Sequence, residues 1–395
     1  MSNWEKVKVK DVCTIVNGGT PKTSVEEYWN SEDVVWITPT DITQLNSKYI
    51  SDSSRKISTK GLSESSATLL PVGSVLMCSR ATIGPCAINT IPVSTNQGFK
   101  SFICSERINN EYLYYLISIL KDYFIDNASG STFLEVSKSV VENCELMLPP
   151  LKEQQKIAEI LSSVDAVIEK TEQVIAKTEE VKKGLMQQLL TKGIGHTEFK
   201  QTELGEIPVE WEIKNLVEVA VLTMGQSPSS EDCNEDGQGL VFFQGCSEFG
   251  DKYPIPKKYC TNPRKRASKG DILISVRAPV GDLNIAHIEC AIGRGLAAID
   301  PINIDRDYLF YYFKLYKDQW QRIQQGSTFS AINKNDLESV LVPCPPKDEQ
   351  MLIVSKLLTL DKKLEIETEQ LDSLQILKKG LMQQLLTGQV RVKVD

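Results

Sequence analysis

A ten-residue segment occurs twice in this chain, and its two copies are identical. Lys182–Thr191 returns as Lys378–Thr387, at an offset of 196 positions. Chance does not repeat ten residues in a chain of 395, so the chain is built from two related halves. Each copy closes a long segment of helical pattern, and we therefore expect each half to end in a long helix.

Further landmarks repeat in the same order. Trp4–Pro21, where a strand is expected to enter a glycine-rich turn, returns at Trp211–Pro228 with an offset of 207. Gly73–Gly84 returns at Gly270–Gly281 with an offset of 197. The polar stretches between these landmarks differ: they are residues 44–64 in the first half and 231–268 in the second. A shared framework with divergent polar loops predicts one fold that carries two different binding surfaces.

The composition narrows the class of protein. Hydrophobic residues make up 41% of the chain and charged residues 24%, and no apolar run reaches the ~18 residues of a membrane helix. The charged N-terminus excludes a signal peptide. The ten cysteines lack any C-x-x-C spacing, and His196 and His287 are the only histidines. We therefore expect reduced cysteines, no metal site and a cytoplasmic location.

The net charge of −8 argues against a protein that coats nucleic acid by bulk attraction. A DNA-binding interpretation must therefore depend on local basic patches, or on partners that supply positive charge. The same acidity favours a rival interpretation, a coiled-coil scaffold that binds proteins and reads no DNA.

Two buried strands are predicted to end in an arginine. The apolar runs within 73–79 and 270–276 are followed by Arg80 and Arg277, and each arginine precedes a glycine-containing turn. Each arginine either pairs with a surface carboxylate or is presented to a phosphate or a guanine edge. The sequence leaves both alternatives open.

Polar loop residues offer further candidates for DNA contacts. Gln97 occupies the position equivalent to Arg294, and these side chains read adenine and guanine respectively. Filling a turn is the competing role. Hydroxyl groups also recur, either as helix caps or as phosphate ligands; they are Ser131, Thr132, Ser327 and Thr328.

Aromatic-rich helices are predicted at 111–124 and 307–320, and a proline pair closes each globular part, at Pro149-Pro150 and Pro345-Pro346. The expected fold class is α+β, with two similar globular α/β domains separated by two long antiparallel coiled-coil helices in a pseudo-twofold internal repeat. The expected boundaries are 1–150 and 204–345 for the domains, 151–192 and 346–390 for the helices, and 193–203 for the linker.

The apolar positions of both helical segments follow a 4-3 spacing, which is typical of a coiled coil. The two seams begin at Ile157 and Ile353, and Thr171 and Glu367 interrupt them at equivalent places. We expect the two helices to pack on each other, with the C-terminus close to the first domain. Glycines at 184 and 380 would each cost ~1 kcal/mol inside a helix, which suggests either close approach of another helix or an early helix end.

No catalytic motif is present. The chain lacks a G-x-x-x-x-G-K-[ST] loop and a glycine-rich junction for a methyl-donor cofactor. Glu210, Glu212 and Lys214 form only a weak imitation of a nuclease cluster, because the other half has no equivalent set. We therefore expect neither enzymatic activity nor a cofactor.

The ordered motifs resemble the specificity subunits of type I restriction-modification systems over nearly the whole chain. The resemblance depends on the duplicated block and on motifs at Trp36–Thr38 with Asp41, Ser79-Arg80 with Gly84, Thr95–Phe99, Gly130–Thr132, and Pro149-Pro150 with Glu153-Gln154. The second half departs from this family pattern. Ile292–Leu296, with the sequence Ile-Gly-Arg-Gly-Leu, stands where the first half has Thr-Asn-Gln-Gly-Phe. That departure weakens a carry-over onto Arg294 and fits a different target.

The resemblance implies a non-catalytic DNA reader. Each domain would recognise one half of a split, asymmetric site on double-stranded DNA, and the helices would set the gap between the half-sites. The helices would also dock two methyltransferase subunits, which methylate adenine at N6, and restriction-translocase subunits would join them. The expected DNA contacts are Thr20, Lys22, Arg80, Gln97, Lys100, Ser131, Thr132, Arg277, Arg294, Ser327, Thr328 and Lys334. The expected partner contacts are Glu153, Gln154, Leu185, Gln188, Glu349, Gln350, Leu381 and Gln384.

Overall fold

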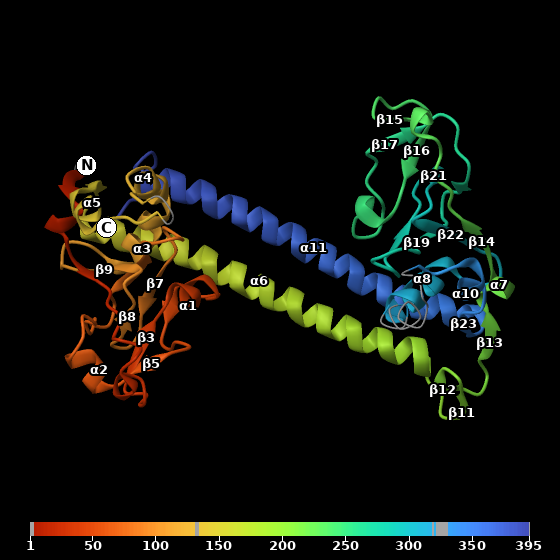
Figure 1. Cartoon of the computed structure of the whole chain (residues 1–395), viewed down its shortest axis with the longest axis horizontal. Helices are drawn as coiled ribbons and strands as arrows, with labels where there is room; N and C mark the ends of the chain where they lie inside the picture. The colour runs from red at the N-terminus through yellow and green to blue at the C-terminus, as the bar shows by residue number, and fades with distance from the viewer. Residues whose placement is uncertain (1–3, 131–133, 318–319, 321–330, 395) are drawn as a thin grey trace. The chain divides into compact units, whose positions relative to one another are not determined.

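The computed structural model describes residues 4–130, 134–317, 320 and 331–394. Two long helices dominate the chain, α6 (Leu151–Lys192) and α11 (Lys347–Leu386) (Figure 1). The chain divides into two compact units, residues 1–172 with 369–395, and residues 173–368. Each unit therefore holds one globular domain, half of α6 and half of α11. The predicted α+β fold, with two similar domains and two long helices, is confirmed.

The globular domain of the first unit contains a five-stranded sheet and a three-stranded sheet. The five strands, in order across the sheet, are β2 (Cys13–Asn17), β9 (Phe99–Cys104), β6 (Val75–Cys78), β7 (Cys86–Asn89) and β4 (Tyr49–Ile50). The three strands are β5 (Lys56–Ile57), β3 (Val34–Ile37) and β8 (Ser94–Thr95), and β1 (Glu5–Lys8) pairs separately with β10 (Glu145–Leu148). The helical segments are η1 (Val9–Asp11), η2 (Glu26–Tyr28), α1 (Pro39–Thr43), α2 (Thr59–Ser63), α3 (Asn110–Ile119), α4 (Lys121–Asp126) and α5 (Lys138–Asn143).

The second unit repeats this plan. Its four-stranded sheet runs β14 (Ala220–Met224), β22 (Leu296–Pro301), β19 (Ile272–Ser275) and β20 (Leu283–Ile285). Its five-stranded sheet runs β15 (Cys233–Asn234), β17 (Lys258–Cys260), β16 (Leu240–Phe243), β21 (Cys290–Ile292) and β18 (Arg266–Ala267). The pairs β11 (Phe199–Thr202) with β12 (Gly205–Pro208), and β13 (Glu212–Asn215) with β23 (Leu341–Cys344), stand apart. Its helical segments are α7 (Leu216–Val219), η3 (Ser230–Asp232), η4 (Cys246–Glu248), α8 (Arg306–Leu315) and α10 (Lys334–Glu338).

The two long helices run antiparallel within each unit. In the first unit, Asp165 of α6 contacts Lys378 of α11, and Glu153 contacts Arg391 beyond the end of α11. Residue numbers therefore increase along α6 in the direction in which they decrease along α11. In the second unit the same order appears, since Asp361 contacts Lys182 and Glu349 accepts a hydrogen bond from the Ile194 amide. The predicted antiparallel packing is confirmed within each unit.

The apolar seams of the helices join the domain cores. In the first unit, Ile157 and Leu161 are fully buried with Leu385 and Tyr112. In the second unit, Ile353 and Leu357 are buried with Leu189 and Tyr308, at equivalent positions 196 residues away. Because burial of apolar surface is the main stabilising term in folding, each domain is fixed to the ends of both helices. Thr171, which interrupts the seam, is itself 5% exposed and donates its hydroxyl to the Val167 carbonyl.

Two local predictions were wrong. The single strand expected within Trp4–Pro21 is two strands, β1 and β2, which pair in different sheets. A 3-10 turn separates them, and the Asp11 carboxylate accepts a hydrogen bond from the Lys8 amide there. The helix expected at 111–124 is likewise interrupted at Leu120, which ends α3 and precedes α4.

The glycines within the long helices have neither of the predicted causes. Helix α6 continues past Gly184 to Lys192, and α11 continues past Gly380 to Leu386. A Cβ atom added at either glycine would meet nothing within 4 Å. Among the described residues, therefore, no neighbouring helix requires a glycine at these positions.

Candidate nucleic-acid interface

Each domain gathers polar loops at one edge of a sheet. In the first domain, β3 and β8 are parallel, so their carboxyl ends meet at the same edge, next to Thr38 and Asn96. In the second domain, β16 and β21 are parallel, and Gln244 and Gly293 follow their ends. We call this part of each domain the loop edge. It comprises residues 18–22, 38 and 95–98 in the first domain, and residues 225–227, 244 and 292–295 in the second.

The backbone of the loop edge is the same in both domains. The Gly19 amide donates to the Thr95 carbonyl at 2.9 Å, and its equivalent, the Gln226 amide, donates to the Ile292 carbonyl at 3.0 Å. The loop lies so close that a Cβ atom at Gly18 would be 1.7 Å from the Asn96 oxygen. Only glycine permits such an approach, and the sequence repeat preserves it at position 225. Two related frameworks therefore present different side chains.

In the first domain, Thr20 and Gln97 contact each other across the loop edge. The Thr20 hydroxyl donates to the Gln97 side-chain oxygen. Gln97 is exposed and Thr20 is half-buried, so the amide is held at the surface by a neighbouring side chain. The structure thus brings together two of the predicted DNA contacts. Lys22, a third, is exposed on the same loop.

Two tryptophans hold the loop of residues 18–22 in place by hydrogen bonds to its backbone. Trp36 donates from its indole nitrogen to the Gly19 carbonyl at 3.0 Å, and Trp29 donates to the Lys22 carbonyl at 3.2 Å. The Arg55 guanidinium lies 4.1 Å from the centre of the Trp29 ring, within cation–π range. No sequence pattern pointed to Trp29 or Arg55, because their contacts depend on the fold.

Arg80 and Lys100 both approach the Glu135 carboxylate. The distance is 3.9 Å from Arg80 Nε and 3.2 Å from Lys100 Nζ. The Arg80 side chain is 46% exposed, and it follows Ser79, whose amide donates to the Gly98 carbonyl of the loop edge. The Lys100 side chain is only 6% exposed. The prediction that Lys100 contacts DNA is therefore wrong for this structure, because its ammonium group is buried beside Glu135 and Ser79.

In the second domain, Ser227 connects the two sides of the loop edge. Its hydroxyl lies 3.0 Å from the Gln244 side-chain oxygen and accepts a hydrogen bond from the Arg294 amide at 3.3 Å. Arg294 is exposed. Ser227 and Gln244 were not among the predicted DNA contacts. The offset of 207 that maps Pro21 onto Pro228 also maps Thr20 onto Ser227, and that signal could have found it.

Arg277 occupies the place of Arg80, but its surroundings differ. Residue 331, which bridges to Arg277, is alanine where the first domain has Glu135. Arg277 is exposed, and no ion pair forms between it and any residue that the structure describes. Lys334 is also exposed, and it pairs with Glu338 at 3.3 Å. Ser131, Thr132, Ser327 and Thr328 lie outside the described residues.

A basic segment also reaches the loop edge of the second domain. Residues 257–269 contain six exposed lysines and arginines and no carboxylate. Lys258 is the register partner of Phe242, near the end of β16. The Lys265 carbonyl accepts a hydrogen bond from the amide of Ile292, at the end of β21. Strand β17 and the residue that precedes β18 therefore place basic residues near the edge where Arg294 lies. The six residues are Lys257, Lys258, Arg264, Lys265, Arg266 and Lys269.

Four predicted partner contacts are instead internal. Glu153, Gln154 and Gln350 are 2%, 0% and 4% exposed, so they offer no surface to a partner. The Glu349 side chain is 12% exposed, and it accepts hydrogen bonds from the Ile194 amide and from Trp211 Nε1, both at 2.9 Å.

The partners of these buried side chains are equivalent in the two halves. The Gln154 side chain accepts a hydrogen bond from the Asn109 amide and donates one to the Pro149 carbonyl. In the same way, the Gln350 side chain accepts a hydrogen bond from the Asp305 amide and donates one to the Pro345 carbonyl. Each glutamine thus closes the junction between its domain and its helix. Their role is architectural, and the assignment to partner binding is corrected.

In each unit, the segment that follows one long helix contacts the first turn of the other long helix. Arg391 donates from Nε and a terminal nitrogen to the two Glu153 oxygens, at 2.8 and 2.7 Å. These hydrogen bonds lower the pKa of Glu153, although burial opposes the shift. The segment after α11 is therefore fixed to the start of α6 in the first unit, as predicted for the C-terminus.

The other predicted partner contacts lie on the duplicated block. Gln188 and Gln384 are exposed, whereas Leu185 and Leu381 are half-buried against the cores of their units. An open face runs beside each glutamine, and its members occupy equivalent positions: Val181, Gly184 and Gln188 on α6, and Leu377, Gly380 and Gln384 on α11. The two apolar members, Val181 and Leu377, are 51% and 50% exposed.

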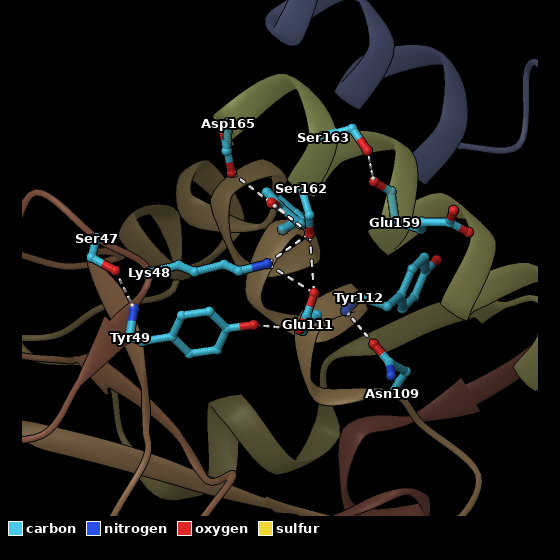
Figure 2. A network of polar contacts seen from close by, with 11 residues as sticks. Ser47, Lys48, Tyr49, Asn109, Glu111, Tyr112, Glu159, Ser162, Ser163 and Asp165 are labelled. Carbon is cyan, nitrogen blue, oxygen red and sulfur yellow. Dashed lines mark hydrogen bonds and ion pairs between the residues drawn. The ribbon is translucent and has the colours of Figure 1, made fainter. Parts of the chain in front are cut away.

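A polar network attaches the first domain to α6 (Figure 2). Lys48 donates to Glu111 at 2.8 Å and to the Ser162 hydroxyl at 2.6 Å, and Tyr49 donates to the same carboxylate. Burial raises the pKa of Tyr49 to about 12, and its hydrogen bond to Glu111 adds to the shift. The network therefore anchors the first domain to α6.

The described residues contain no cluster of three or more metal-binding side chains. None of the helices that the structure describes is both long enough and apolar enough to cross a membrane. Two open cavities of about 350 and 490 Å³ lie along the first turns of α6, and no loop-edge residue lines either one.

Comparisons with known proteins agree with this organisation. The type I restriction modification DNA specificity domain matches residues 1–180 and 208–375. A type I restriction enzyme MjaX specificity subunit from Methanocaldococcus jannaschii is 34% identical over 99% of this chain and 94% of its own length.

Solved structures are also similar. A chain from work on the assembly and conformational transition of the type I R-M system is 28% identical, with a TM-score of 0.65 over 98% of both chains. The HsdS subunit from Thermoanaerobacter tengcongensis is 27% identical, with a TM-score of 0.51 over 98% of this chain and 97% of its own. With two matched domains and similarity along its whole length, this chain belongs to the family of type I restriction-modification DNA specificity subunits.

Proposed function

We propose that this specificity subunit reads a two-part DNA sequence, with one half-site contacted by the loop edge of each domain. The observation that carries the proposal is the shared backbone framework with unlike side chains: Thr20 and Gln97 in one domain, Ser227 and Arg294 in the other. A shared framework allows both domains to approach DNA in the same way. Different side chains then select different bases.

The first domain carries an amide suited to adenine. A glutamine side chain can bond to both N6 and N7 of adenine in the major groove. Thr20 already restrains Gln97, so less rotamer freedom is lost when the amide meets a base. Arg80 and Lys22 are exposed next to this amide and would contact the phosphate backbone.

The second domain carries cations suited to guanine and phosphate. Arg294 can donate two hydrogen bonds to O6 and N7 of guanine. The basic segment 257–269 reaches the same edge and would neutralise phosphates. Arg277 would add a further phosphate contact. This local charge answers the objection that the chain as a whole is acidic.

The long helices would bind the methyltransferase subunits and fix the distance between the half-sites. The open face on α6 recurs on α11 at an offset of 196, so the same partner surface would fit both faces. Two equivalent faces account for two copies of one partner. Gly184 and Gly380 leave room for a partner backbone to approach closely. Restriction-translocase subunits would join this core in the cytoplasm, and the chain itself would carry out no chemistry.

The test exchanges one domain at a time. Residues 1–150 are replaced by the equivalent domain of another specificity subunit, the complex is reconstituted with methyltransferase subunits, and methylated adenines are mapped. One half-site should change and the other should remain. In the unchanged background, Arg294→Ala should relax the half-site read by the second domain alone.

Arg107→Ala is the matched control, because Arg107 is an exposed arginine that pairs with Glu5 and lies outside the loop edge. It should leave both half-sites unchanged. If domain exchange altered neither half-site, the proposal would be wrong. The rival interpretation, a protein-binding scaffold, predicts that outcome.

A further inference from the structure

Two pairs of cysteines face each other across antiparallel strands. Cys13 of β2 is in register with Cys104 of β9, and Cys233 of β15 is in register with Cys260 of β17. All ten cysteines of the chain are free thiols. The repeat does not explain the pairs, because positions 220 and 301, which correspond to Cys13 and Cys104, are alanine and proline.

The hydrogen-bond pattern tells which kind of cross-strand position each pair occupies. The Ser105 amide donates to the Val12 carbonyl at 2.9 Å, so residues 12 and 105 form a hydrogen-bonded pair. Hydrogen-bonded and non-hydrogen-bonded pairs alternate along an antiparallel ladder. The next pair, Cys13 and Cys104, is therefore non-hydrogen-bonded.

The second cysteine pair has the same surroundings. The Thr261 amide donates to the Asp232 carbonyl at 3.0 Å, which makes residues 232 and 261 a hydrogen-bonded pair. Cys233 and Cys260, the next pair along, are therefore also non-hydrogen-bonded. Both cysteine pairs thus occupy the same type of site, one in each domain.

Side chains at non-hydrogen-bonded sites lie closer together than at the alternate sites. Their Cα atoms are separated by about 4.5 Å, and disulfides join residues whose Cα atoms are about 4.4–6.8 Å apart. Cys13 and Cys104 lie in one apolar cluster, and Cys233 packs against the cluster that contains Cys260. Both pairs can therefore be bridged without movement of the strands.

We propose that each DNA-reading domain contains a latent cross-strand disulfide, Cys13–Cys104 in the first and Cys233–Cys260 in the second, which a small-molecule disulfide oxidant can form in the folded chain. The Cys233–Cys260 bond would join β15 to β17 within the divergent segment 231–268, which also contains basic residues that reach the second loop edge. The Cys13–Cys104 bond would join the two strands that precede and follow the first loop edge.

The reaction needs a two-electron oxidant such as oxidised glutathione. The thiolate of a half-buried cysteine, Cys104 or Cys233, attacks one glutathione sulfur, forms a mixed disulfide and releases one glutathione thiolate. The buried partner, Cys13 or Cys260, then loses its proton and attacks the protein sulfur of the mixed disulfide. A second glutathione thiolate leaves. The two protein protons are taken up by the two glutathione thiolates, and the protein pair is oxidised by two electrons.

The thiols resist this reaction at neutral pH. A hydrogen bond with the Cys104 thiol, together with burial, raises the pKa of Cys13. Burial and the neighbouring Cys260 raise the pKa of Cys233. Because only the thiolate is nucleophilic, both bonds should form faster as the pH rises.

The chain contains its own negative control. Cys78 of β6 and Cys86 of β7 lie on neighbouring strands, but Cys86 is in register with Met77. Cys78 belongs to one apolar cluster and Cys86 packs against another, on the opposite face of the sheet. The two residues lie on neighbouring strands, but their side chains are on opposite faces of the sheet. No disulfide is therefore expected between them.

The experiment treats the folded full-length chain with oxidised glutathione at mildly alkaline pH. Free thiols are counted by alkylation and intact mass, and linked peptides are mapped without reduction. We expect the thiol count to fall from ten to six, because each of the two pairs consumes two. Cys13 should be linked to Cys104 and Cys233 to Cys260, and the thermal midpoint should rise.

Single variants separate the two bonds. Cys104→Ser should prevent the first link and leave the second, and Cys233→Ser should do the reverse. A chain that keeps ten thiols, stops at glutathione adducts, links Cys78 to Cys86, or forms the links only after unfolding would overturn the proposal. Since the readout is covalent, it does not depend on whether the chain reads DNA.

Discussion

Lys378 on α11 and Asp165 on α6 form an ion pair, with 2.7 Å between Nζ and Oδ1. Tyr115 of the first domain donates to the other oxygen of the same carboxylate at 2.5 Å. One aspartate therefore joins a domain to both long helices. Lys378 belongs to the duplicated block, and its equivalent, Lys182, pairs with Asp361, which accepts from Tyr311. The repeated sequence thus encodes a repeated three-part junction.

Removal of the Asp165 carboxylate should weaken the first unit. Asp165→Ala deletes the acceptor of Tyr115 and the partner of Lys378, and should cost about 1–3 kcal/mol. Asp165→Asn keeps an acceptor and loses only the charge, so it should cost about 0–1 kcal/mol. Chemical denaturation of the purified chain measures both values. Glu172→Ala, at an exposed site on the same helix, should change stability by less than about 0.5 kcal/mol. Equal losses for all three variants would contradict the junction.

The ion pair between Glu153 and Arg391 should make stability depend on pH. The folded pKa of Glu153 is lowered, so the pair contributes fully above the unfolded value near 4.5 and its contribution is lost as the pH falls through the folded value. Arg391→Met should therefore lower the thermal midpoint at neutral pH, and the difference from the natural chain should shrink below about pH 4.5. Lys393→Met, an exposed neighbour, supplies the control. A difference that stays constant down to pH 3 would count against this linkage.

Alanine at the helix glycines should stabilise the chain on its own. Gly184 and Gly380 adopt helical structure with open space around them, and alanine in place of each should gain about 1 kcal/mol. Gly18→Ala should instead prevent correct folding of the first domain, because its Cβ atom would overlap the Asn96 carbonyl. If the methyltransferase subunits cover the open face, the helix variants should also bind those subunits more weakly. Stability is read by denaturation and binding by titration; a loss of stability at Gly184→Ala would refute the first expectation.

The basic segment of the second domain should control the salt dependence of DNA binding. Each lysine or arginine that neutralises a phosphate contributes about 0.9 to the slope of log K against log salt. Replacing Lys257, Lys258, Arg264 and Lys265 with glutamine should lower that slope by up to this amount per residue, while the recognised sequence remains the same. The measurement titrates DNA onto the reconstituted complex at several salt concentrations.

The matched control for the salt experiment lies in the first domain. Lys56 and Lys60 are paired with Glu32 and Glu27, so their replacement by glutamine should change the slope less. An unchanged slope in the four-residue variant would remove the segment from the interface.

The sequence by itself determined the repeat, the two long helices and their seams, and the two buried strands that end just before Arg80 and Arg277. These features follow from local pattern: a helix that begins at Leu151 directly after Pro149-Pro150 needs only its own residues to be recognised. The equivalence of Gln97 and Arg294 was also readable, because offsets between the halves are properties of the chain.

Only the tertiary structure decided which polar residues face inward. Glu153 pairs with Arg391, 238 positions away, and Lys100 is buried beside Glu135. Neither contact can be inferred from the residues adjacent in the sequence. The split of β1 from β2 depends on two different partner strands, and the facing of Cys13 and Cys104 depends on a register. Periodicity fixes which elements form, whereas pairing between distant elements fixes what each side chain meets, and that pairing is set by the packing of the whole unit.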